Sequence, residues 1–325
     1  MKSIEIYHSI FQQYLDKKMF TQAPQELYEP VNYILSLGGK RLRPLLVLMG
    51  CDLFNGKILK ALPVAMAVEI FHNFTLLHDD IMDAAPLRRG KPTVHIQYNV
   101  NTGILSGDVM LIYAYHFLAQ VKSARTTAKL INIFNKMAIE VCEGQQWDMN
   151  FESRNDVTIT EYIRMIELKT SVLIAAAFQM GALLGGASEA VAEKLYEFGR
   201  NVGIAFQIQD DILDTFGDPE KFGKKVGGDI AQNKKTFLVL KSYELANTTQ
   251  RTDLQELMTT NGLSENEKIE AVKNIFNTLK IRDAAETLMN QYLKIAFENI
   301  DETPLSIEKK NYLKTWANDL MERQV

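Results

Sequence analysis

Cysteine is scarce in this sequence, because 325 residues contain only two, Cys51 and Cys142. One pair cannot build the disulfide framework that stabilises small secreted domains, so a reducing compartment is expected. An excess of charge of one sign is also lacking, since 36 Lys and Arg oppose 40 Asp and Glu and give a net charge of −4. This balance argues against a general nucleic-acid-binding protein, which would carry a basic field over its whole domain.

Long hydrophobic runs are lacking as well. Polar residues, among them Glu5, Gln12 and Asp16, interrupt the first twenty residues, which argues against a secretory signal. The most apolar stretch, residues 172–187, is shorter than the ~18–20 residues that a membrane span needs. It also contains Gln179 and three glycines. We therefore expect a buried core helix at residues 172–187, and a cytoplasmic protein with no stable membrane insertion.

Strand patterns are the third absence, because strict apolar–polar alternation is scarce and hairpin dipeptides are nearly missing. Instead, apolar residues recur every three or four positions. This spacing predicts helices over residues 4–15, 63–81, 103–121, 126–147, 161–184, 192–213, 265–279, 284–297 and 307–321. Thr160 and Ser264 are predicted N-caps. We expect an all-α fold of ten or more helices, and no break in composition divides residues 1–325 into separate domains.

The pattern Asp-Asp-Ile-apolar-Asp occurs twice, at residues 79–83 and 210–214. Each copy ends a long predicted helix, and positions four apart share a helix face. Three carboxylates at a helix C-terminus repel one another and oppose the helix dipole. A single copy would be explained equally well as an acidic helix end exposed to solvent. Two copies in matching contexts favour a site for Mg²⁺, which combines carboxylates with water and phosphate oxygens.

Basic residues occur in turns near these motifs. Residues 38–44 (GGKRLRP) place three cations in a glycine-rich turn, and Arg88-Arg89-Gly90 follows the first motif. Arginine suits bidentate phosphate recognition, and lysine neutralises phosphate as a point charge. The turn context favours phosphate binding by Lys40, Arg43, Arg88 and Arg89. Simple solubility charge is the preferred interpretation for Arg41, Lys225 and Lys235.

A second irregular segment, residues 215–235, contains four glycines and five lysines. It is long for a structureless connection inside a helical protein, and such loops usually serve as lids or binding loops. We expect it to close over a ligand and exclude water.

Together these motifs resemble those of the trans-type (all-E) isoprenyl diphosphate synthases, or polyprenyl synthetases, which include farnesyl and geranylgeranyl diphosphate synthases. The motifs stand in the family's order: residues 38–44, Glu69-x-x-His72, residues 76–90, Lys169-Thr170, residues 203–214 and residues 223–229. The resemblance implies one isoprenyl diphosphate synthase domain over residues 1–325. Its fold would be a single large helical bundle with a central cavity lined by two aspartate-rich helices.

The resemblance also implies roles for individual residues. By this resemblance, the metal ligands would be Asp79, Asp83 and Asp210. Asp80, Asp211 and Asp214 would orient these ligands or contact the metal through water. The residues that would contact the allylic diphosphate or its metal complex are Arg88, Lys169, Thr170, Gln207, Lys224 and Lys234. The separate isopentenyl diphosphate site would consist of Lys40, Arg43, His72 and Arg89. About three Mg²⁺ per active site, the two diphosphate substrates and a homodimer are implied as cofactor and partners.

The implied reaction is ionisation of an allylic diphosphate, attack by isopentenyl diphosphate and loss of a proton. Phe74 and Thr75 lie about one turn before Asp79 on its face, where they would form the floor of the product channel. The first motif lacks the two-residue insertion of typical bacterial farnesyl diphosphate synthases. A single aromatic residue five positions upstream resembles archaeal geranylgeranyl diphosphate synthases, so C20 is favoured over C15.

Three other functions remain open on the sequence. A longer-chain polyprenyl diphosphate synthase would share every motif. A terpene cyclase would share the acidic motifs but has no need of a second diphosphate site, so residues 38–44 and Arg88-Arg89 count against it. A non-catalytic helical subunit would be free to lose aspartates, whereas both acidic motifs are intact.

Overall fold

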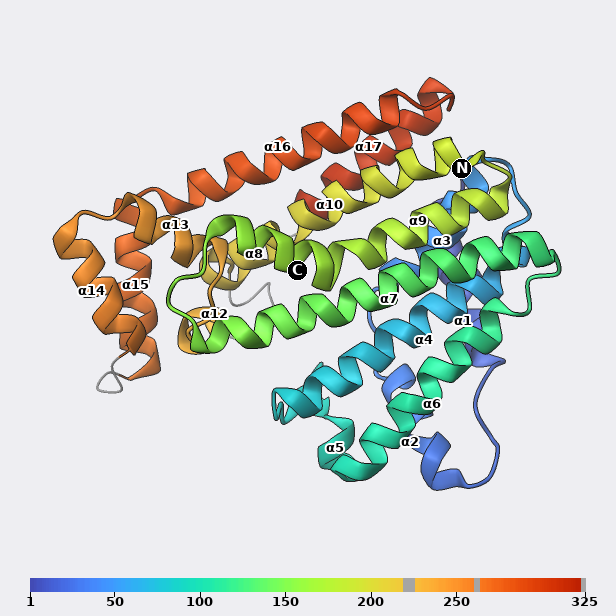
Figure 1. Cartoon of the computed structure of the whole chain (residues 1–325), viewed down its shortest axis with the longest axis horizontal. Helices are drawn as coiled ribbons and strands as arrows, with labels where there is room; N and C mark the ends of the chain where they lie inside the picture. Colours follow the sequence, from blue (N-terminus) through green and yellow to red (C-terminus); the bar gives the residue numbers. More distant parts are fainter. Residues whose placement is uncertain (219–225, 260–263, 323–325) are drawn as a thin grey trace. The chain divides into compact units, whose positions relative to one another are not determined.

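Helices make up nearly all of the computed structural model, which describes residues 1–218, 226–259 and 264–322 (Figure 1). The predicted all-α class is confirmed. The chain divides into two compact units, here called unit 1 (residues 1–135 and 176–196) and unit 2 (residues 136–175 and 197–325). Three long helices contribute residues to both units: α7 (Ala124–Ser153), α9 (Val172–Gly185) and α10 (Glu189–Phe216).

Unit 1 is built around α4, a helix of 25 residues. Besides parts of α7, α9 and α10, its elements are α1 (Ile4–Asp16), α2 (Gln25–Ser36), α3 (Leu42–Leu53), α4 (Ile58–Met82), β1 (Leu87–Arg88), β2 (Lys91–Pro92), α5 (Val94–Gln97) and α6 (Val100–Leu118). Helices α3 and α6 both pack on α4, and α4 and α6 run side by side (Figure 1). Gly107 of α6 permits this approach, because a Cβ there would clash with the His78 imidazole of α4. The packing fixes the C-terminal end of α4, where the first acidic motif lies.

One short hairpin departs from the all-helical expectation. Leu87 pairs with Pro92 and Arg88 with Lys91 in an antiparallel ladder. The two residues at its tip, Arg89 (φ 53°) and Gly90 (φ 73°), both have positive φ, as a type I′ turn requires. Two strand residues on each side are too few for an alternation pattern, which explains why the sequence did not reveal the hairpin.

Unit 2 has its own hydrophobic core. Its elements, besides parts of α7 and α10, are α8 (Ile159–Ile166), η1 (Glu167–Ser171), α12 (Gly228–Ala231), α13 (Phe237–Leu245), α14 (Thr248–Thr259), α15 (Glu265–Thr278), α16 (Ile281–Asp301) and α17 (Ile307–Glu322). Helices α8, α10, α13, α15 and α16 bury side chains such as Ile166, Ile208, Phe237, Phe276 and Ala285 in this core. The predicted irregular segment 215–235 is therefore partly helical, because α10 runs to Phe216 and α12 follows; residues 219–225 lie outside the described residues.

The predicted helix over residues 161–184 is interrupted by the π-helical turn η1. Two glycines bring neighbouring helices against its backbone. A Cβ at Gly144 of α7 would clash with the backbone of Lys169, and one at Gly203 of α10 would lie 2.7 Å from the Cα of Ser171. Single π turns inside α-helices often occur at functional sites, and this one carries Lys169 and Thr170.

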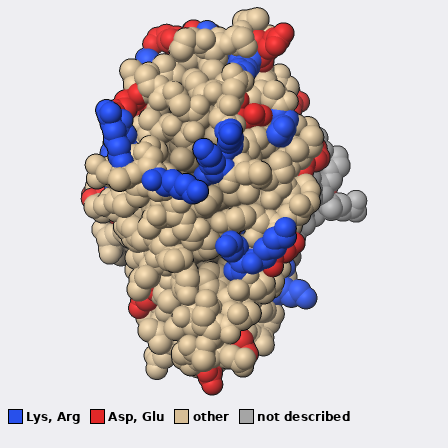
Figure 2. Space-filling view, turned by 90° about the vertical axis from the view of Figure 1, so that its right-hand side faces the viewer, with Lys and Arg blue, Asp and Glu red and all other residues tan. Residues whose placement is uncertain are grey.

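The most apolar helical stretch is buried. Among the described residues, Ile159–Gly185 is the one stretch long and apolar enough to cross a membrane by length and composition, and 67% of its most apolar window is buried in the fold. Ala175, Ala176, Ala177 and Phe178 are 0% exposed, so the prediction of a buried core helix is confirmed. On the face shown in Figure 2, Lys and Arg side chains are dispersed in small groups over a largely uncharged surface.

Candidate active site

The first acidic motif ends α4 as predicted. The backbone N–H of Asp83 donates to the carbonyl of Asp79 at 2.9 Å, so helical geometry continues to Asp83 and the two side chains share a face. Asp80, one residue after Asp79, is instead buried and accepts both donors of the Arg88 fork. The Nε–Oδ2 distance is 2.8 Å and the Nη2–Oδ1 distance is 2.7 Å. This bidentate pair attaches the hairpin to α4.

The charges of four arginines act on His72, which lies two helical turns before Asp79. The Arg43 Nη1 atom lies 3.1 Å from His72 Nε2. Because arginine can only donate, Nε2 is the acceptor and the ring proton resides on Nδ1. Burial, followed by the positive charges of Arg43, Arg89, Arg88 and Arg41, lowers the pKa of His72 well below its ordinary value. His72 is therefore neutral at physiological pH, in surroundings suited to an anion.

The glycine-rich turn before α3 meets the hairpin tip. Arg89 Nη1 donates to the carbonyl oxygen of Gly38. Gly39 adopts φ 117°, and a Cβ there would lie 2.6 Å from the Arg89 guanidinium, so only glycine fits. Lys40 follows and is exposed. Of the predicted isopentenyl diphosphate site, the structure thus joins Arg43 to His72, and Arg89 to the turn that carries Lys40.

The interpretation of Arg41 as a solubility charge is wrong. Its side chain is buried, and Nη1 lies 2.5 Å from Oε1 of Glu69. A charged residue in a glycine-rich turn usually faces water, which is why the sequence suggested solubility. The partner that permits burial lies 28 residues away on α4, beyond the reach of any local pattern.

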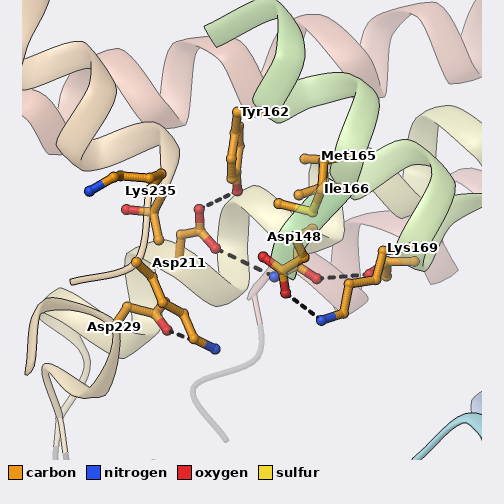
Figure 3. A pocket seen from close by; sticks show the side chains of 12 residues that line it. Asp148, Tyr162, Met165, Ile166, Lys169, Asp211, Asp229 and Lys235 are labelled. Carbon is orange, nitrogen blue, oxygen red and sulfur yellow. Dashed lines mark hydrogen bonds and ion pairs between the residues drawn. The ribbon is translucent and has the colours of Figure 1, made fainter. Parts of the chain in front are cut away.

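In unit 2, one pocket gathers much of the predicted allylic diphosphate site (Figure 3). Its lining includes the predicted residues Lys169, Thr170, Gln207, Asp211 and Lys234. Lys235, interpreted from sequence as solubility charge, lines it too. Thr170 Oγ1 donates to Gln207 Oε1 at 3.2 Å, and Gln207 Nε2 lies 3.4 Å from Asp211 Oδ1. Lys224 lies outside the described residues.

Sequence reasoning missed two side chains of this pocket, Asp148 and Tyr162. Asp148 Oδ2 of α7 lies 2.6 Å from the Lys169 ammonium, and the Tyr162 hydroxyl donates to Asp211 Oδ2 (Figure 3). Burial, then the charge of Asp211, raises the pKa of Tyr162 well above its ordinary value, so the phenol remains protonated. Its spacing of seven residues before Lys169, two helical turns, was a usable signal.

The second acidic motif lies within α10, close to its end. Asp214 Oδ2 accepts the backbone N–H of Asp229 at 3.0 Å, and the Lys234 ammonium lies 3.8 Å from the Asp229 carboxylate. Burial, followed by the charge of Asp214, raises the pKa of Asp229 to about 6; Asp148 and Asp210 act in the same direction and Lys234 opposes them. Negative charge is therefore in excess in this part of unit 2.

These carboxylates suit a hard divalent cation. Among the residues that the structure describes, no group of three or more His, Cys, Asp or Glu is arranged to hold a metal alone. Mg²⁺ does not require such a group, because it binds through one or two carboxylates together with water and substrate phosphate. The donor set and the repulsion felt by Asp229 fit a cation that binds along with a phosphorylated ligand.

Phe74 and Thr75, the predicted floor of the product channel, are half-buried in unit 1. The Phe74 ring centroid lies 5.7 Å from that of Phe71 and 4.8 Å from that of His78. Thr75 Oγ1 donates to the His72 carbonyl at 2.8 Å. Aromatic neighbours on both sides therefore hold Phe74 in one place on α4.

Comparisons with known proteins agree with these motifs. The polyprenyl synthetase family model matches residues 24–278. Geranylgeranyl diphosphate synthase of Methanosarcina mazei is 44% identical over 231 residues, which cover 71% of each protein. The enzyme of the same name from Sulfolobus acidocaldarius is 38% identical over 280 residues, 85% of this chain and 84% of that protein. The structure also resembles a crystal structure of a geranylgeranyl pyrophosphate synthase over 100% of both chains, with a TM-score of 0.95 and 47% identity.

Proposed function

Because this chain belongs to the polyprenyl synthetase family, we propose that it is a short-chain trans-prenyltransferase. It condenses isopentenyl diphosphate with dimethylallyl, geranyl and farnesyl diphosphates, and C20 is the favoured product. The observation that supports this proposal is the presence of two separate sites with basic side chains, one suited to a diphosphate alone and the other, with its carboxylates, to a diphosphate together with a metal ion. One is the arginine cluster around His72 in unit 1, and the other is the pocket with Lys169 and Lys234 in unit 2. A terpene cyclase, with one diphosphate substrate, needs one such site.

The family typically requires a divalent metal. We propose that Asp79, Asp83 and Asp210 ligate Mg²⁺, about three ions per active site. Asp80, Asp211 and Asp214 orient these ligands or act through water; the contacts from Arg88 to Asp80 and from Tyr162 to Asp211 support this division. When bound, the ions neutralise the diphosphate that leaves the allylic carbon.

The chain's own residues bind and orient the two substrates. Arg88, Lys169, Lys224 and Lys234 hold the allylic diphosphate, while the oxygens of Thr170 and Gln207 stabilise the allylic cation. Lys40, Arg43, His72 and Arg89 hold isopentenyl diphosphate with its double bond in line for attack. The new carbon–carbon bond forms at carbon 1 of the allylic group, and the departing diphosphate takes the proton.

Release of inorganic diphosphate tests this proposal. With dimethylallyl diphosphate and Mg²⁺, we expect release only when isopentenyl diphosphate is added, because condensation consumes both substrates. Release from geranylgeranyl diphosphate alone would instead indicate a cyclase. No release from any allylic diphosphate, with or without isopentenyl diphosphate, would indicate a non-catalytic subunit.

Replacing Phe74 by alanine is expected to lengthen the product beyond C20. The change removes the ring held between Phe71 and His78 and deepens the channel by about the length of an isoprene unit. Mass spectrometry of the dephosphorylated products measures the shift. Leu76→Ala is the matched control, because Leu76 is also half-buried on α4 but lies about 160° around the helix from Phe74. Unchanged length in Phe74→Ala would exclude Phe74 as the floor.

We further propose a homodimer that buries one face of α6. This helix exposes Ile104, Leu105 and Ile112, which are 43%, 58% and 66% accessible. Exposed apolar side chains on one helix face mark interaction surfaces. Ile112→Asp is expected to weaken the dimer by about tenfold or more, since it places a charge in an apolar contact; sedimentation over a range of concentrations measures this. Leu59→Asp, at the exposed start of α4, should leave the dimer intact, and dissociation in both variants would argue against α6.

We also propose that residues 1–325 act as one cytoplasmic synthase domain. The family model extends over residues of both units, which supports a single functional domain. Burial of the most apolar helix supports a location away from the membrane interior.

A further inference from the structure

A buried ion pair lies in unit 1 between Arg41 and Glu69, neither of which is among the proposed diphosphate contacts or metal ligands. Arg41 is 6% exposed and Glu69 is 3% exposed. Arg41 Nη1 lies 2.5 Å from Glu69 Oε1, and Arg41 Nη2 donates to the carbonyl of Leu35. Asn73 Nδ2 donates to the same Glu69 oxygen at 2.9 Å. Buried charges persist only when they are paired and hydrogen-bonded in this way.

The pair connects the two segments that carry the arginine cluster. Arg41 is the N-cap of α3 and stands two residues before Arg43. Glu69 stands one turn before His72 on α4, and Arg43 and His72 are themselves in contact at 3.1 Å. The ion pair therefore adds a buried link, beside the Arg43–His72 contact, between the turn of residues 38–43 and the helix that carries His72.

The pair also sets the local charge. Burial, followed by the charge of Arg41, lowers the pKa of Arg89; the charge of Glu69 raises it, and that of Arg88 lowers it further. The carboxylate of Glu69 therefore stabilises the charged form of Arg89, and the positive charge of Arg41 offsets this stabilisation. Without Arg41, the unpaired carboxylate of Glu69 would attract the neighbouring guanidinium groups and compete with a bound diphosphate for them.

We propose that Arg41 and Glu69 are positioning residues for isopentenyl diphosphate. Arg41 anchors the turn to α4 and neutralises Glu69, so that the charges of Arg43 and Arg89 remain available to the diphosphate. Neither residue of the pair touches the substrate. This inference rests on the function proposed for the arginine cluster.

Steady-state kinetics of Arg41→Gln test the inference. We expect the KM for isopentenyl diphosphate to rise about tenfold or more, because Glu69 is left uncompensated, while the KM for the allylic substrate changes less than about twofold. Glu69→Gln keeps an oxygen acceptor for Arg41 and Asn73, so its KM should stay within about threefold of wild type. The double variant Arg41→Gln/Glu69→Gln removes the stranded carboxylate and should recover most of the loss.

Arg200→Gln is the matched control. Arg200 likewise forms ion pairs, at 2.6 Å to Glu197 and 3.1 Å to Glu167, but it belongs to unit 2. Its KM for isopentenyl diphosphate should not change. Circular dichroism and melting curves establish that each variant is folded. If Arg41→Gln does not fold, Arg41→Lys, which keeps the charge but loses the fork, should raise the same KM severalfold, and the double variant should remain near wild type.

Three results would overturn the inference: an unchanged KM for isopentenyl diphosphate in a folded Arg41 variant, an equal rise in both KM values, or no recovery in the double variant. Should the wild type catalyse no condensation, the proposed function fails separately. Calorimetric titration with isopentenyl diphosphate then decides the role of Arg41, since weaker binding to Arg41→Gln than to wild type supports it and equal binding refutes it.

Discussion

Replacing Asp79 by asparagine is expected to lower kcat by about 10³-fold or more without lowering stability. The lost carboxylate is a proposed metal ligand, and metal ions contribute several kcal/mol of transition-state stabilisation in such reactions. Stability should hold, because the change relieves repulsion within residues 79–83 and removes a negative charge from a helix C-terminus. Diphosphate release at saturating Mg²⁺ and substrates measures kcat, and a thermal melt without metal measures stability.

Asp16→Asn provides the control for Asp79. Asp16 is the last residue of α1 and is exposed, so it shares the helix-end position without the acidic motif. We expect full activity from Asp16→Asn. An Asp79→Asn protein with wild-type kcat would contradict the proposed metal site, and one that melts well below wild type would show that Asp79 serves the fold instead.

Replacing Arg88 by glutamine is expected to cost both stability and rate. Asp80 loses both donors of its bidentate partner while it remains buried. The free energy of unfolding should fall by about 2–3 kcal/mol, which is at the low end for a broken buried ion pair because 24% of the Arg88 side chain is exposed. The proposed contact with the allylic diphosphate is lost as well, so kcat should fall about 10²-fold. Denaturant unfolding and diphosphate release measure the two effects.

The double variant Arg88→Gln/Asp80→Asn separates the two roles of Arg88. Neutralising Asp80 should restore most of the stability, because no buried carboxylate is left unpaired, whereas kcat should stay low. Recovery of kcat together with stability would mean that Arg88 acts only through Asp80. Arg154→Gln is the control, since Arg154 pairs with Asp156 and Glu161 at 2.8 Å on the surface, where ion pairs contribute little.

The features that sequence predicted well are those encoded within a few residues. Periodicity identified most of the long helices, because an amphipathic or buried helix repeats its apolar positions at 3.6 residues. It did not identify the shorter helices α2, α3, α13 and α14. Ser264 was predicted as an N-cap and forms a capping box with Glu267. The prediction of Thr160 was wrong by two residues, because Thr158 makes the cap with Glu161. Of these two threonines, only Thr158 has a glutamate three positions later, so the capping-box pattern would have identified Thr158 as the N-cap.

The features that sequence missed depend on contacts between distant segments. Glu69 turns Arg41 into a buried anchor across 28 residues, and Asp211 engages Tyr162 across 49. Local spacing identifies neither pair: the position of Tyr162 two turns before Lys169 indicates its helix face, but its partner Asp211 is known only from the fold. The motifs predict which residues bind diphosphate, and the fold was needed to show which side chains contact those residues.

Chain-length analysis of the wild-type product is the most direct test of the proposed function. The protein is incubated with dimethylallyl diphosphate, excess isopentenyl diphosphate and Mg²⁺, and the dephosphorylated products are identified by mass spectrometry. The proposed function predicts an all-trans C20 alcohol as the main product, formed by three successive condensations. Failure to incorporate isopentenyl diphosphate, or a main product longer than C20, would contradict it.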